Sequence, residues 1–519
     1  MLVKTYSSTV EGIDARTITV EVNLSPGIRF LVVGLPDNAV KESQQRITAA
    51  FANTGFRMPG FNILVNMAPA DLRKAGSHYD LPIAIGILAA SQQIGRIDRL
   101  EKYILIGELS LDGTLLPVKG ALPIAVQARK EGYEGIILPA ANAPEAAVVD
   151  GLRVYGATDL TSVATLLDSG SGIEPTEIDT RREYFDRLAD FDLDFRDVKG
   201  QNDVKRALEI AAAGGHNVLM IGPPGSGKSM LAKRMPTITP PMTLAEALET
   251  TKIHSVAGKL GTSEEGGYRG GLLTARPFRA PHHIASEVAL VGGSVPPQPG
   301  EISLAHNGIL FLDELPEFHR RTLEVLRQPL DEKRISISRA RYTVDYPANF
   351  MLIAAMNPCP CGYRTHPDKE CTCTPSAQAR YMDRISGPLL DRIDIQIEVV
   401  PVAIESMTQR RREGETSAAI RERVIAARER QIARLQRDGY RHTYCNAMLT
   451  PEQLDRYCQL DDESIDLLRE AMSTMGLSGR AYDRILKVSR TIADLAGSEE
   501  IRLDHVAEAI QYRSLDCMR

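Results

Sequence analysis

The sequence predicts a multidomain α/β protein, and three observations support that fold class. The chain has 519 residues, enough for three or four domains of ordinary size. Apolar strand-like segments and helical segments alternate through residues 1–170 and again through residues 190–402. The second region also contains a G-x-x-x-x-G-K-S motif between an apolar strand and a helix.

The composition is that of an ordinary globular protein and excludes several functional classes. Hydrophobic residues make up 43% of the chain and charged residues 25%, which argues against a largely disordered scaffold. The formal net charge is −6, so any nucleic-acid binding must come from local basic patches. Aromatic residues make up 5% and tryptophan is absent, which argues against an extended platform for stacking bases.

The expected location is the cytoplasm, with no membrane partner. The N-terminus alternates as a strand does and lacks the apolar region of a signal peptide. The most apolar stretch, Leu81 to Ala90, is shorter than the roughly 20 residues that cross a bilayer. In the reducing compartment that this implies, the seven cysteines do not indicate a disulfide framework.

Residues 1–170 are expected to form an α+β domain with its own core. The apolar patterns predict strands at 17–22, 28–33, 62–67, 103–107 and 136–138, and helices at 38–53, 81–93 and 122–131. The periodicity ends at Ser169, where the sequence SGSGIEPTEIDT covers residues 169–180, and residues 171–189 are expected to form a linker.

The second region opens with a predicted phosphate-binding loop. An apolar strand at 217–221 runs into the loop at 222–229 and then into a helix at 230–234. Glycines allow backbone N–H groups to surround phosphates, and the helix N-terminus adds partial positive charge. Lys228 is expected to reach the β and γ phosphates of ATP, and Ser229 to bind Mg²⁺. The complete predicted ATP–Mg²⁺ set of the loop is Gly222, Pro223, Pro224, Gly225, Ser226, Gly227, Lys228 and Ser229.

Hydrolysis also requires a carboxylate on the magnesium side and a group that orients water. Asp313 and Glu314 follow the apolar strand 309–312, which suits those two roles in that order. A third apolar strand, 350–356, ends at Asn357, whose side chain is a candidate sensor of the γ-phosphate.

These motifs resemble those of the AAA+ ATPases. Three further segments, ARPFRAPHH at 275–283, PGEISLAHNG at 299–308 and SGPLLDRID at 386–394, are similar to the magnesium-chelatase-like branch. With LSGR at 477–480, they resemble the ComM/YifB group of competence-associated proteins over essentially the whole chain. The resemblance implies a hexameric ring with ATP between subunits. It also implies that Arg392 is an arginine finger and Arg480 a sensor arginine of a C-terminal lid.

The helical segments after the ATPase core are expected to form a connector, 403–445, and a lid, 446–519. Between 403 and 441 there are ten arginines and six acidic residues. Apolar residues recur at near-helical spacing, which predicts an amphipathic helix. They are Ile420, Val424, Ala427 and Leu435.

Two elements are candidates for DNA contact. Lys228 and Asp313 are 85 positions apart, which leaves room for an insert at about 250–298. This insert contains Lys252 and Lys259 and resembles the helix-2 insert of this branch. Residues 334–338 and 342–346 predict a hairpin with Arg339 and Arg341 at its tip, resembling the pre-sensor hairpin. In a ring both elements would project towards the pore and contact phosphates without reading bases. The alternative is a solvated hairpin whose arginines pair with carboxylates.

Four cysteines lie within residues 359–373. The spacing of Cys359, Cys361, Cys371 and Cys373 fits one tetrahedral structural Zn²⁺ site. His366 lies between the pairs, but four thiolates are preferred over three thiolates and a histidine. Free or redox-active thiols are the alternative.

Residues 107–118 are similar to a stretch of the Lon-protease fold. A Lon peptidase needs a Ser–Lys dyad within hydrogen-bond reach. In this chain the serine position falls on His78 and the lysine position on Leu122, while Ser77 and Lys119 lie nearby but out of register. The first domain is therefore expected to be Lon-like without peptidase chemistry.

The resemblance as a whole implies a hexameric ATP-dependent DNA translocase or helicase that promotes branch migration during homologous recombination of transforming DNA. Its expected partners are single-stranded, forked or branched DNA and further copies of the chain, with recombination proteins as additional candidates. Two alternatives stay open at this point: a chelatase-type ATPase that remodels a protein partner, and a Lon-like ATP-dependent protease.

Overall fold

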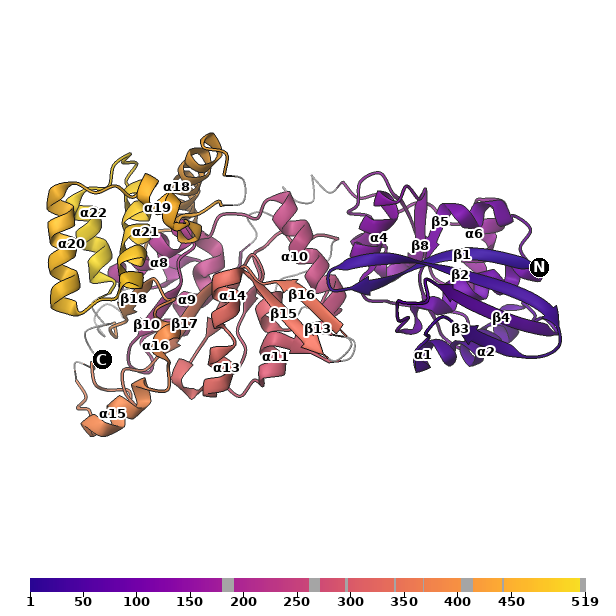
Figure 1. The fold of residues 1–519 in the computed structure, drawn as a ribbon, viewed down its shortest axis with the longest axis horizontal. Coiled ribbons are helices and arrows are strands. Elements are labelled where there is room, and N and C mark those ends of the chain that lie inside the picture. Colours follow the sequence, from indigo (N-terminus) through magenta and orange to yellow (C-terminus); the bar gives the residue numbers. More distant parts are fainter. Residues whose placement is uncertain are drawn as a thin grey trace.

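The structure is a computed structural model that describes residues 1–179, 191–260, 271–294, 297–339, 342–366, 368–402, 414–440 and 443–513. The molecule is elongated (Figure 1). An N-terminal domain lies at one end, a five-stranded sheet with its helices in the middle, and a group of C-terminal helices at the other end. No helix within the described ranges is long and apolar enough to cross a membrane.

The N-terminal domain is built on a mixed seven-stranded sheet. The strand order is β3-β4-β2-β1-β5-β8-β9. The strands are β1 (Leu2–Glu11), β2 (Asp14–Pro26), β3 (Phe30–Val33), β4 (Phe61–Ala68), β5 (Tyr103–Leu105), β8 (Gly135–Pro139) and β9 (Arg153–Ala157). The α-helices are α1 (Asn38–Lys41), α2 (Ser43–Thr54), α3 (Asp80–Ala90), α4 (Ala121–Lys130), α5 (Ala143–Ala146) and α6 (Leu160–Ser169). Short strands β6 (Glu108–Leu109) and β7 (Leu115–Leu116) form a separate ribbon.

Most of the expected elements of this domain are present, with two differences. The single helix expected at 38–53 is two helices, α1 and α2, which meet at Glu42. The backbone of the first residues after α6 remains bonded to the domain, because the Thr176 N–H donates to the Val154 carbonyl at 2.7 Å. The described part of the expected linker therefore lies along the domain, and residues 180–190 fall outside the described ranges.

The central sheet is parallel throughout, in the order β11-β14-β17-β10-β18. Its strands are β11 (Phe278–Arg279), β14 (Ile309–Leu312), β17 (Met351–Met356), β10 (Val218–Ile221) and β18 (Ile395–Glu398). Alternate residues of β10 enter two different cores: Val218 and Met220 pack on one face, Leu219 and Ile221 on the other. Helices cover both faces, which is why these strands are continuous apolar runs. The carboxyl ends of the strands share one edge of the sheet, where loops form ligand sites.

The remaining elements of the middle region surround that sheet. Its helices are α8 (Asn202–Gly214), α9 (Lys228–Ile238), α10 (Leu244–Ala257), α11 (Glu287–Val291), α12 (Glu301–Leu304), α13 (Arg320–Glu324), α14 (Arg327–Glu332), α15 (Pro375–Met382) and α16 (Gly387–Leu390). Two antiparallel ribbons project from it: β12 (Gly292–Gly293) with β13 (Gln298–Pro299), and β15 (Arg334–Arg339) with β16 (Tyr342–Pro347). The second ribbon has the bounds expected of the hairpin within one residue at each strand.

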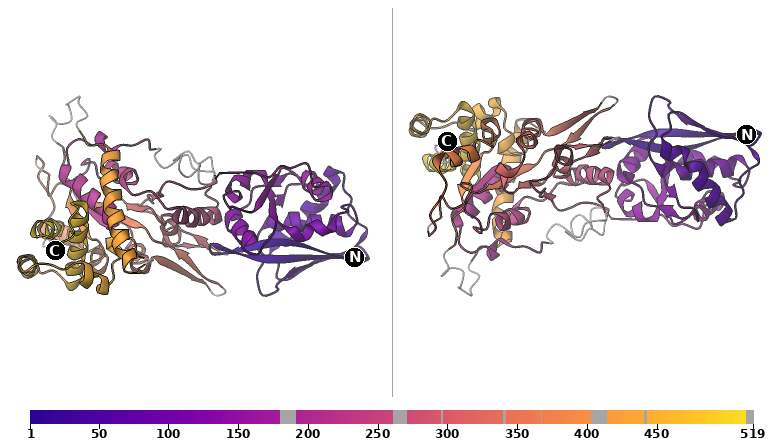
Figure 2. Two further views of the ribbon diagram at one scale, coloured as in Figure 1. Left: turned by 90° about the horizontal axis from the view of Figure 1, so that it is seen from above. Right: turned by 90° about the horizontal axis from the view of Figure 1, so that it is seen from below.

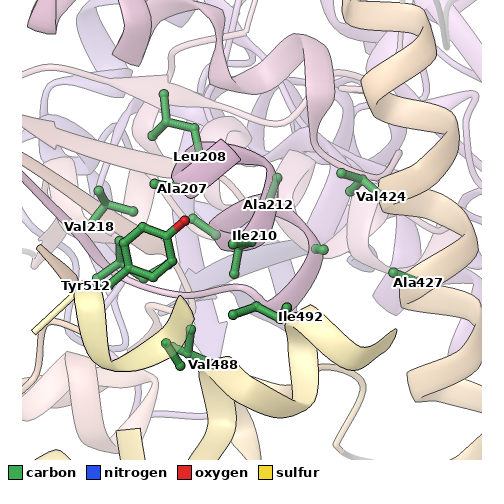
Figure 3. Close-up of a cluster of buried hydrophobic side chains, with 14 of the residues drawn as sticks. Ala207, Leu208, Ile210, Ala212, Val218, Val424, Ala427, Val488, Ile492 and Tyr512 are labelled. Atoms are coloured by element: carbon green, nitrogen blue, oxygen red, sulfur yellow. The ribbon is translucent and has the colours of Figure 1, made fainter. Parts of the chain in front are cut away.

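The C-terminal helices share a core with the sheet. They are α18 (Ser417–Arg437), α19 (Pro451–Tyr457), α20 (Asp462–Met475), α21 (Gly479–Leu495) and α22 (Leu503–Gln511). Figure 3 shows residues of α8, α18 and α21 pointing into one cluster. The amphipathic prediction for α18 is confirmed, because its four apolar positions are all buried, at 2% exposure or less.

The N-terminal domain is docked on α10. Met242, Ala247 and Leu272 belong to the same buried cluster as the helices and strands of that domain. The Ser255 hydroxyl donates to the Glu145 carboxylate, which is buried on the domain side of the contact. Burial raises the pKa of Glu145, opposed by the bond from Ser255. The two views of Figure 2 show the domain extending beyond the end of α10.

A buried carboxylate among the C-terminal helices provides a stability prediction. Asp494 accepts hydrogen bonds from Arg434 at 2.8 Å, Arg490 at 3.1 Å and Asn446 at 2.8 Å. Asp494→Ala removes the carboxylate from two largely buried guanidinium groups, so the free energy of unfolding of the C-terminal helices should fall by about 3–5 kcal/mol. Urea unfolding followed by circular dichroism measures the change. Asp466→Ala breaks the exposed pair with Arg469 and should cost less than about 1 kcal/mol. Equal effects of the two substitutions would contradict the prediction.

Candidate functional site

The glycine-rich loop lies at the carboxyl edge of the central sheet, between β10 and α9. Gly225 and Gly227 have φ of +79° and +93°, a conformation that favours glycine. Gly222 passes so close to β18 that an added Cβ would lie 2.2 Å from the Val399 carbonyl oxygen. Glycine is thus required here by geometry as well as by the motif. The loop leads directly into the N-terminus of α9, which favours anions.

Lys228 is held at the centre of the loop. Its ammonium donates to the carbonyls of Gly222 at 2.7 Å and Pro223 at 2.9 Å, and to the Asn357 side-chain oxygen at 3.3 Å. Burial lowers the pKa of Lys228, opposed by the carboxylates of Asp313 and Glu314. The end of β17 therefore places Asn357 beside the phosphate loop, where a γ-phosphate sensor would have to lie.

Ser229 and Asp313 form the adjacent pair. The Ser229 hydroxyl donates to the Asp313 carboxylate at 2.6 Å, although 84 positions separate the two residues. Only β17 lies between β14 and β10 in the parallel sheet, so Asp313 after β14 and Ser229 after β10 lie at the same edge. A hydroxyl and a carboxylate in contact are suitable ligands for Mg²⁺ beside a phosphate. This part of the site fits a magnesium nucleotide.

Glu314 extends beyond the sheet in a constrained backbone conformation. Its φ is +53°, and its N–H donates to the Asp313 side chain at 3.0 Å. Its carboxylate lies 3.0 Å from Nδ1 of His283, on the loop that follows β11. The Glu314 side chain is 53% exposed, so a water molecule can reach it. His283 thus determines the direction of the carboxylate expected to activate water.

Two residues of the site were given no role by the sequence analysis. His283 belongs to the ARPFRAPHH segment, which was noted only as a family motif. Gln201 has φ of +55°, and its side-chain amide donates to the Ser226 carbonyl at 2.7 Å and the Val400 carbonyl at 3.2 Å. It therefore joins the phosphate loop to β18. An isolated histidine or glutamine gives no pattern from which such contacts could be predicted.

Arg392 lies at the opposite end of the sheet from the phosphate loop. The side-chain amide of Asn217, just before β10, donates to the Arg392 carbonyl at 2.9 Å. The loop begins after β10, so a four-residue strand of about 13 Å separates the two positions. The guanidinium pairs with Asp331, with Nε at 2.9 Å from the carboxylate. Arg392 is therefore directed away from the nucleotide site of its own chain.

Arg480 is close to Arg392. It is the second residue of α21, and its guanidinium lies 3.8 Å from Asp391 with 62% of the side chain exposed. The two arginines line one polar cavity of about 210 Å³. The lining residues are Asp331, Asp391, Arg392, Arg480, Asp483, Arg484 and Lys487. Three carboxylates and four cationic groups converge there, which suits an ionic partner.

The four cysteines of the 359–373 loop come together. The Sγ atom of Cys359 is 3.3 Å from that of Cys361 and 3.6 Å from that of Cys371, and all four sulfurs lie within 4.8 Å of one another. A tetrahedral site with Zn–S bonds of about 2.3 Å places its sulfurs about 3.8 Å apart. Backbone N–H donors, first that of Tyr363, lower the pKa of Cys361 to about 6, whereas burial raises the pKa of Cys359. The geometry therefore fits one Zn²⁺.

The predicted DNA contacts are only partly described. Lys252 lies 3.7 Å from Asp14 of the N-terminal domain and is 21% exposed, so it faces the domain contact. Lys259 follows the C-terminal end of α10, and its N–H donates to the His254 carbonyl at 2.9 Å. The side chain of Arg339 and all of Arg341 lie outside the described residues.

The two candidate dyad residues of the N-terminal domain, Ser77 and Lys119, each contact a different part of the molecule. The Ser77 hydroxyl donates to Glu108, and Lys119 packs on Gly258 at the end of α10. At the positions matched to the Lon pattern, the His78 ring contacts the Ser8 carbonyl at 3.0 Å and Leu122 is buried.

Comparison with known proteins identifies the family. The sequence family of magnesium chelatase subunit ChlI matches residues 194–407 and 20–142, and that of its C-terminal region matches residues 414–513. Competence protein ComM of Haemophilus influenzae is 45% identical over 513 residues, which cover 98% of this chain and 97% of that protein. YifB of Salmonella typhimurium is 44% identical over 506 residues, covering 97% and 96%. The chain belongs to the ComM/YifB group.

Members of the magnesium-chelatase family are AAA+ ATPases, and the geometry at the carboxyl edge of the sheet agrees with that activity. In this ComM/YifB chain Glu314→Gln should abolish ATP hydrolysis and preserve ATP binding, because the amide keeps the shape of the side chain but cannot accept a proton from water. Lys228→Ala should weaken nucleotide binding itself. Phosphate release and binding of a fluorescent ATP analogue provide the two measurements. Near-normal turnover by the Glu314 variant would contradict the assignment.

The cysteine geometry makes a second prediction for the same chain. About one Zn²⁺ per chain should copurify with the protein when chelators are omitted. Cys371→Ser should lose the metal, whereas Cys458→Ser, at a buried cysteine of the lid, should retain it. Elemental analysis of each protein gives the ratio. Absence of zinc from the unsubstituted protein would show that the thiols are free.

Proposed function

We propose that this chain is a ring-forming, ATP-driven DNA translocase that promotes branch migration when transforming DNA recombines. Six copies would place an ATP–Mg²⁺ site at each subunit contact. The chain would bind single-stranded, forked or branched DNA, and recombination proteins are further candidate partners. Arg392, Arg480 and Asn357 would complete each site around the phosphate loop.

The main support for a ring-shaped assembly is the separation of Arg392 from the phosphate loop of its own chain. A group that stabilises charge on a transferred phosphoryl must contact the phosphate. Arg392 stands at the opposite end of β10, so in this chain it can reach only a nucleotide bound by a neighbour. Its salt bridge with Asp331 would then open as the neighbour enters the polar cavity. A closed ring allows every subunit to give and receive such a contact.

The DNA activity is supported by the relatedness to ComM, whose name records a role in competence, and by the β15–β16 ribbon. That ribbon projects from the sheet beside β13 (Figure 1). The Tyr346 hydroxyl donates to the Pro297 carbonyl at 2.9 Å, so the two ribbons form one projecting unit. Arginines at the tip of such a unit, repeated around a ring, suit a phosphate backbone.

The two alternatives receive less support. A Lon-like protease requires a serine and a lysine in contact, whereas Ser77 is bonded to Glu108 and Lys119 lies against α10. A chelatase-type ATPase that remodels a protein partner shares the ATP site, so the site cannot distinguish it. Stimulation of ATP hydrolysis by forked DNA would distinguish the two, since the remodelling role predicts no effect of DNA.

The position of Arg392 predicts action in trans. Arg392→Ala should abolish hydrolysis and leave ATP binding by each subunit intact. Mixed with Glu314→Gln protein it should regain part of the activity, because a hybrid ring contains contacts in which both residues are present. Arg469→Ala, at an exposed surface pair, should remain fully active and is the control. No recovery at any mixing ratio would contradict the proposed finger.

The tip of the β15–β16 ribbon predicts the mode of DNA binding. Changing Arg339 and Arg341 to Ala should weaken binding to DNA of any sequence and flatten the dependence of log affinity on log salt, since fewer counterions are released. Basal ATP hydrolysis should persist, but DNA-stimulated hydrolysis and unwinding should be lost. Changing Arg96 and Arg153 to Ala removes the same charge from the exposed surface of the N-terminal domain and should leave the slope unchanged. An unchanged slope with full unwinding in the ribbon variant would place the DNA contacts elsewhere.

A further inference from the structure

The cysteine loop begins at the nucleotide site. Asn357, which contacts Lys228 at 3.3 Å, is followed after one proline by Cys359, the buried member of the cysteine group. On the other side of the loop, the Tyr381 hydroxyl of α15 lies beside the backbone of Asn357. The cysteine loop therefore starts next to Asn357, and the helix after the loop lies against Asn357 again. The loop thus joins the cysteine group to the residue expected to sense the γ-phosphate.

Helix α15, which follows the cysteine loop, also contacts the cysteine group. The Gln378 side-chain amide donates to Sγ of Cys371 and to the Cys373 carbonyl, each at 3.4 Å. Gln378 and Tyr381 are three residues apart on the helix, so they share one face. One face of α15 thus contacts both the cysteine group and the Asn357 backbone.

A direct contact joins the cysteine loop to the phosphate loop. Gly362 follows Cys361 with φ of +83°, and a Cβ added there would lie 2.6 Å from Cδ of Pro224 and 3.9 Å from Cγ of Asn357. The backbone of the cysteine loop is therefore packed against the loop expected to surround phosphates. The turn that brings Gly362 there is closed by its N–H, which donates to the Cys359 carbonyl at 2.9 Å.

We propose that metal binding by the four cysteines and nucleotide binding by the phosphate loop are energetically coupled, with Gly362 as the positioning residue between them. A metal on the four thiolates would fix the turn at Gly362 and so support the Pro224 side of the phosphate loop and Asn357. Nucleotide bound there would in turn hold the turn in its metal-binding shape. This inference rests on the proposed nucleotide site and on the proposed Zn²⁺, and it adds a dependence of each on the other.

Coupling between two binding sites is reciprocal, which makes the proposal quantitative. The zinc affinity of the whole protein is measured by competition with a chelator of known affinity, with and without a non-hydrolysable Mg–ATP analogue. The affinity for the analogue is measured with and without zinc. The analogue should raise the zinc affinity at least about five-fold, and zinc should raise the analogue affinity by the same factor. Lys228→Ala protein, tested at an analogue concentration that no longer saturates it, should show a smaller change in zinc affinity or none.

A matched pair of glycine substitutions tests the contact itself. Gly362→Ala and Gly439→Ala place alanine at nearly equal φ, +83° and +84°, but an added Cβ at Gly439 has nothing within 4 Å. Both proteins carry similar backbone strain, so their difference reports the contact with Pro224. Gly362→Ala should retain about one zinc and bind the analogue at least about five-fold more weakly than Gly439→Ala.

Three results would overturn the proposal, and each identifies a different failure. Equal zinc affinity with and without the analogue, in protein that binds both, would show that the sites are independent. Failure of the four cysteines to bind zinc would remove the metal. Failure of the unsubstituted protein to bind the analogue would overturn the proposed nucleotide site as well.

Discussion

The central constraint in this structure is a single buried carboxylate at the amino end of the central sheet. Asp394, 1% exposed, accepts the Asn217 N–H at 2.9 Å and a hydrogen bond from Arg484 at 2.8 Å, and lies 3.5 Å from the His216 ring. Burial acts to raise the pKa of Asp394, but the charge of Arg484 and the nearby His216 ring hold it well below its ordinary value. A buried charge is retained only where such partners converge.

Those partners come from different layers, so the carboxylate sets their relative positions. Asn217 precedes β10, Asp394 precedes β18 and Arg484 belongs to α21 of the lid. The lid is thereby held against the end of the sheet that lies away from the phosphate loop. Because the folded pKa of Asp394 is lowered, its stabilising contribution is present above the ordinary aspartate pKa and is lost as the pH falls through the folded value. The positions of Arg392 and Arg480 depend on this arrangement.

Much of the nucleotide site could be predicted because its residues end strands. Once 217–221, 309–312 and 350–356 are recognised as parallel strands, their following residues must share one edge, and Lys228, Ser229, Asp313 and Asn357 are indeed in contact there. The cysteine group was equally predictable, since four thiols within 15 positions can meet only locally. Helical spacing was enough to identify the buried face of α18.

The remaining contacts depend on tertiary packing that leaves no local pattern. His283 reaches Glu314 because β11 pairs with β14, and a two-residue strand has no periodicity to reveal it. Val40, Ile47, Ala50 and Phe51 fall on one face of a single helix over 38–53, so the break at Glu42 was not predictable from period alone. The docking of α10 on the N-terminal domain likewise joins residues more than 100 positions apart, as Ser255 and Glu145 show.

Because of that docking, the linker is not the only connection between the N-terminal domain and the ATPase core. The N-terminal domain and the ATPase core share apolar residues, Met242, Ala247 and Leu272, that would face water if the domain left. The tip of the β1–β2 ribbon adds a second contact, because a Cβ at Gly12 would lie 3.1 Å from Val344 of β16. Cutting the chain within residues 180–190 would therefore leave two fragments that stay together. An ATPase core produced without residues 1–170 would expose an apolar surface that favours aggregation.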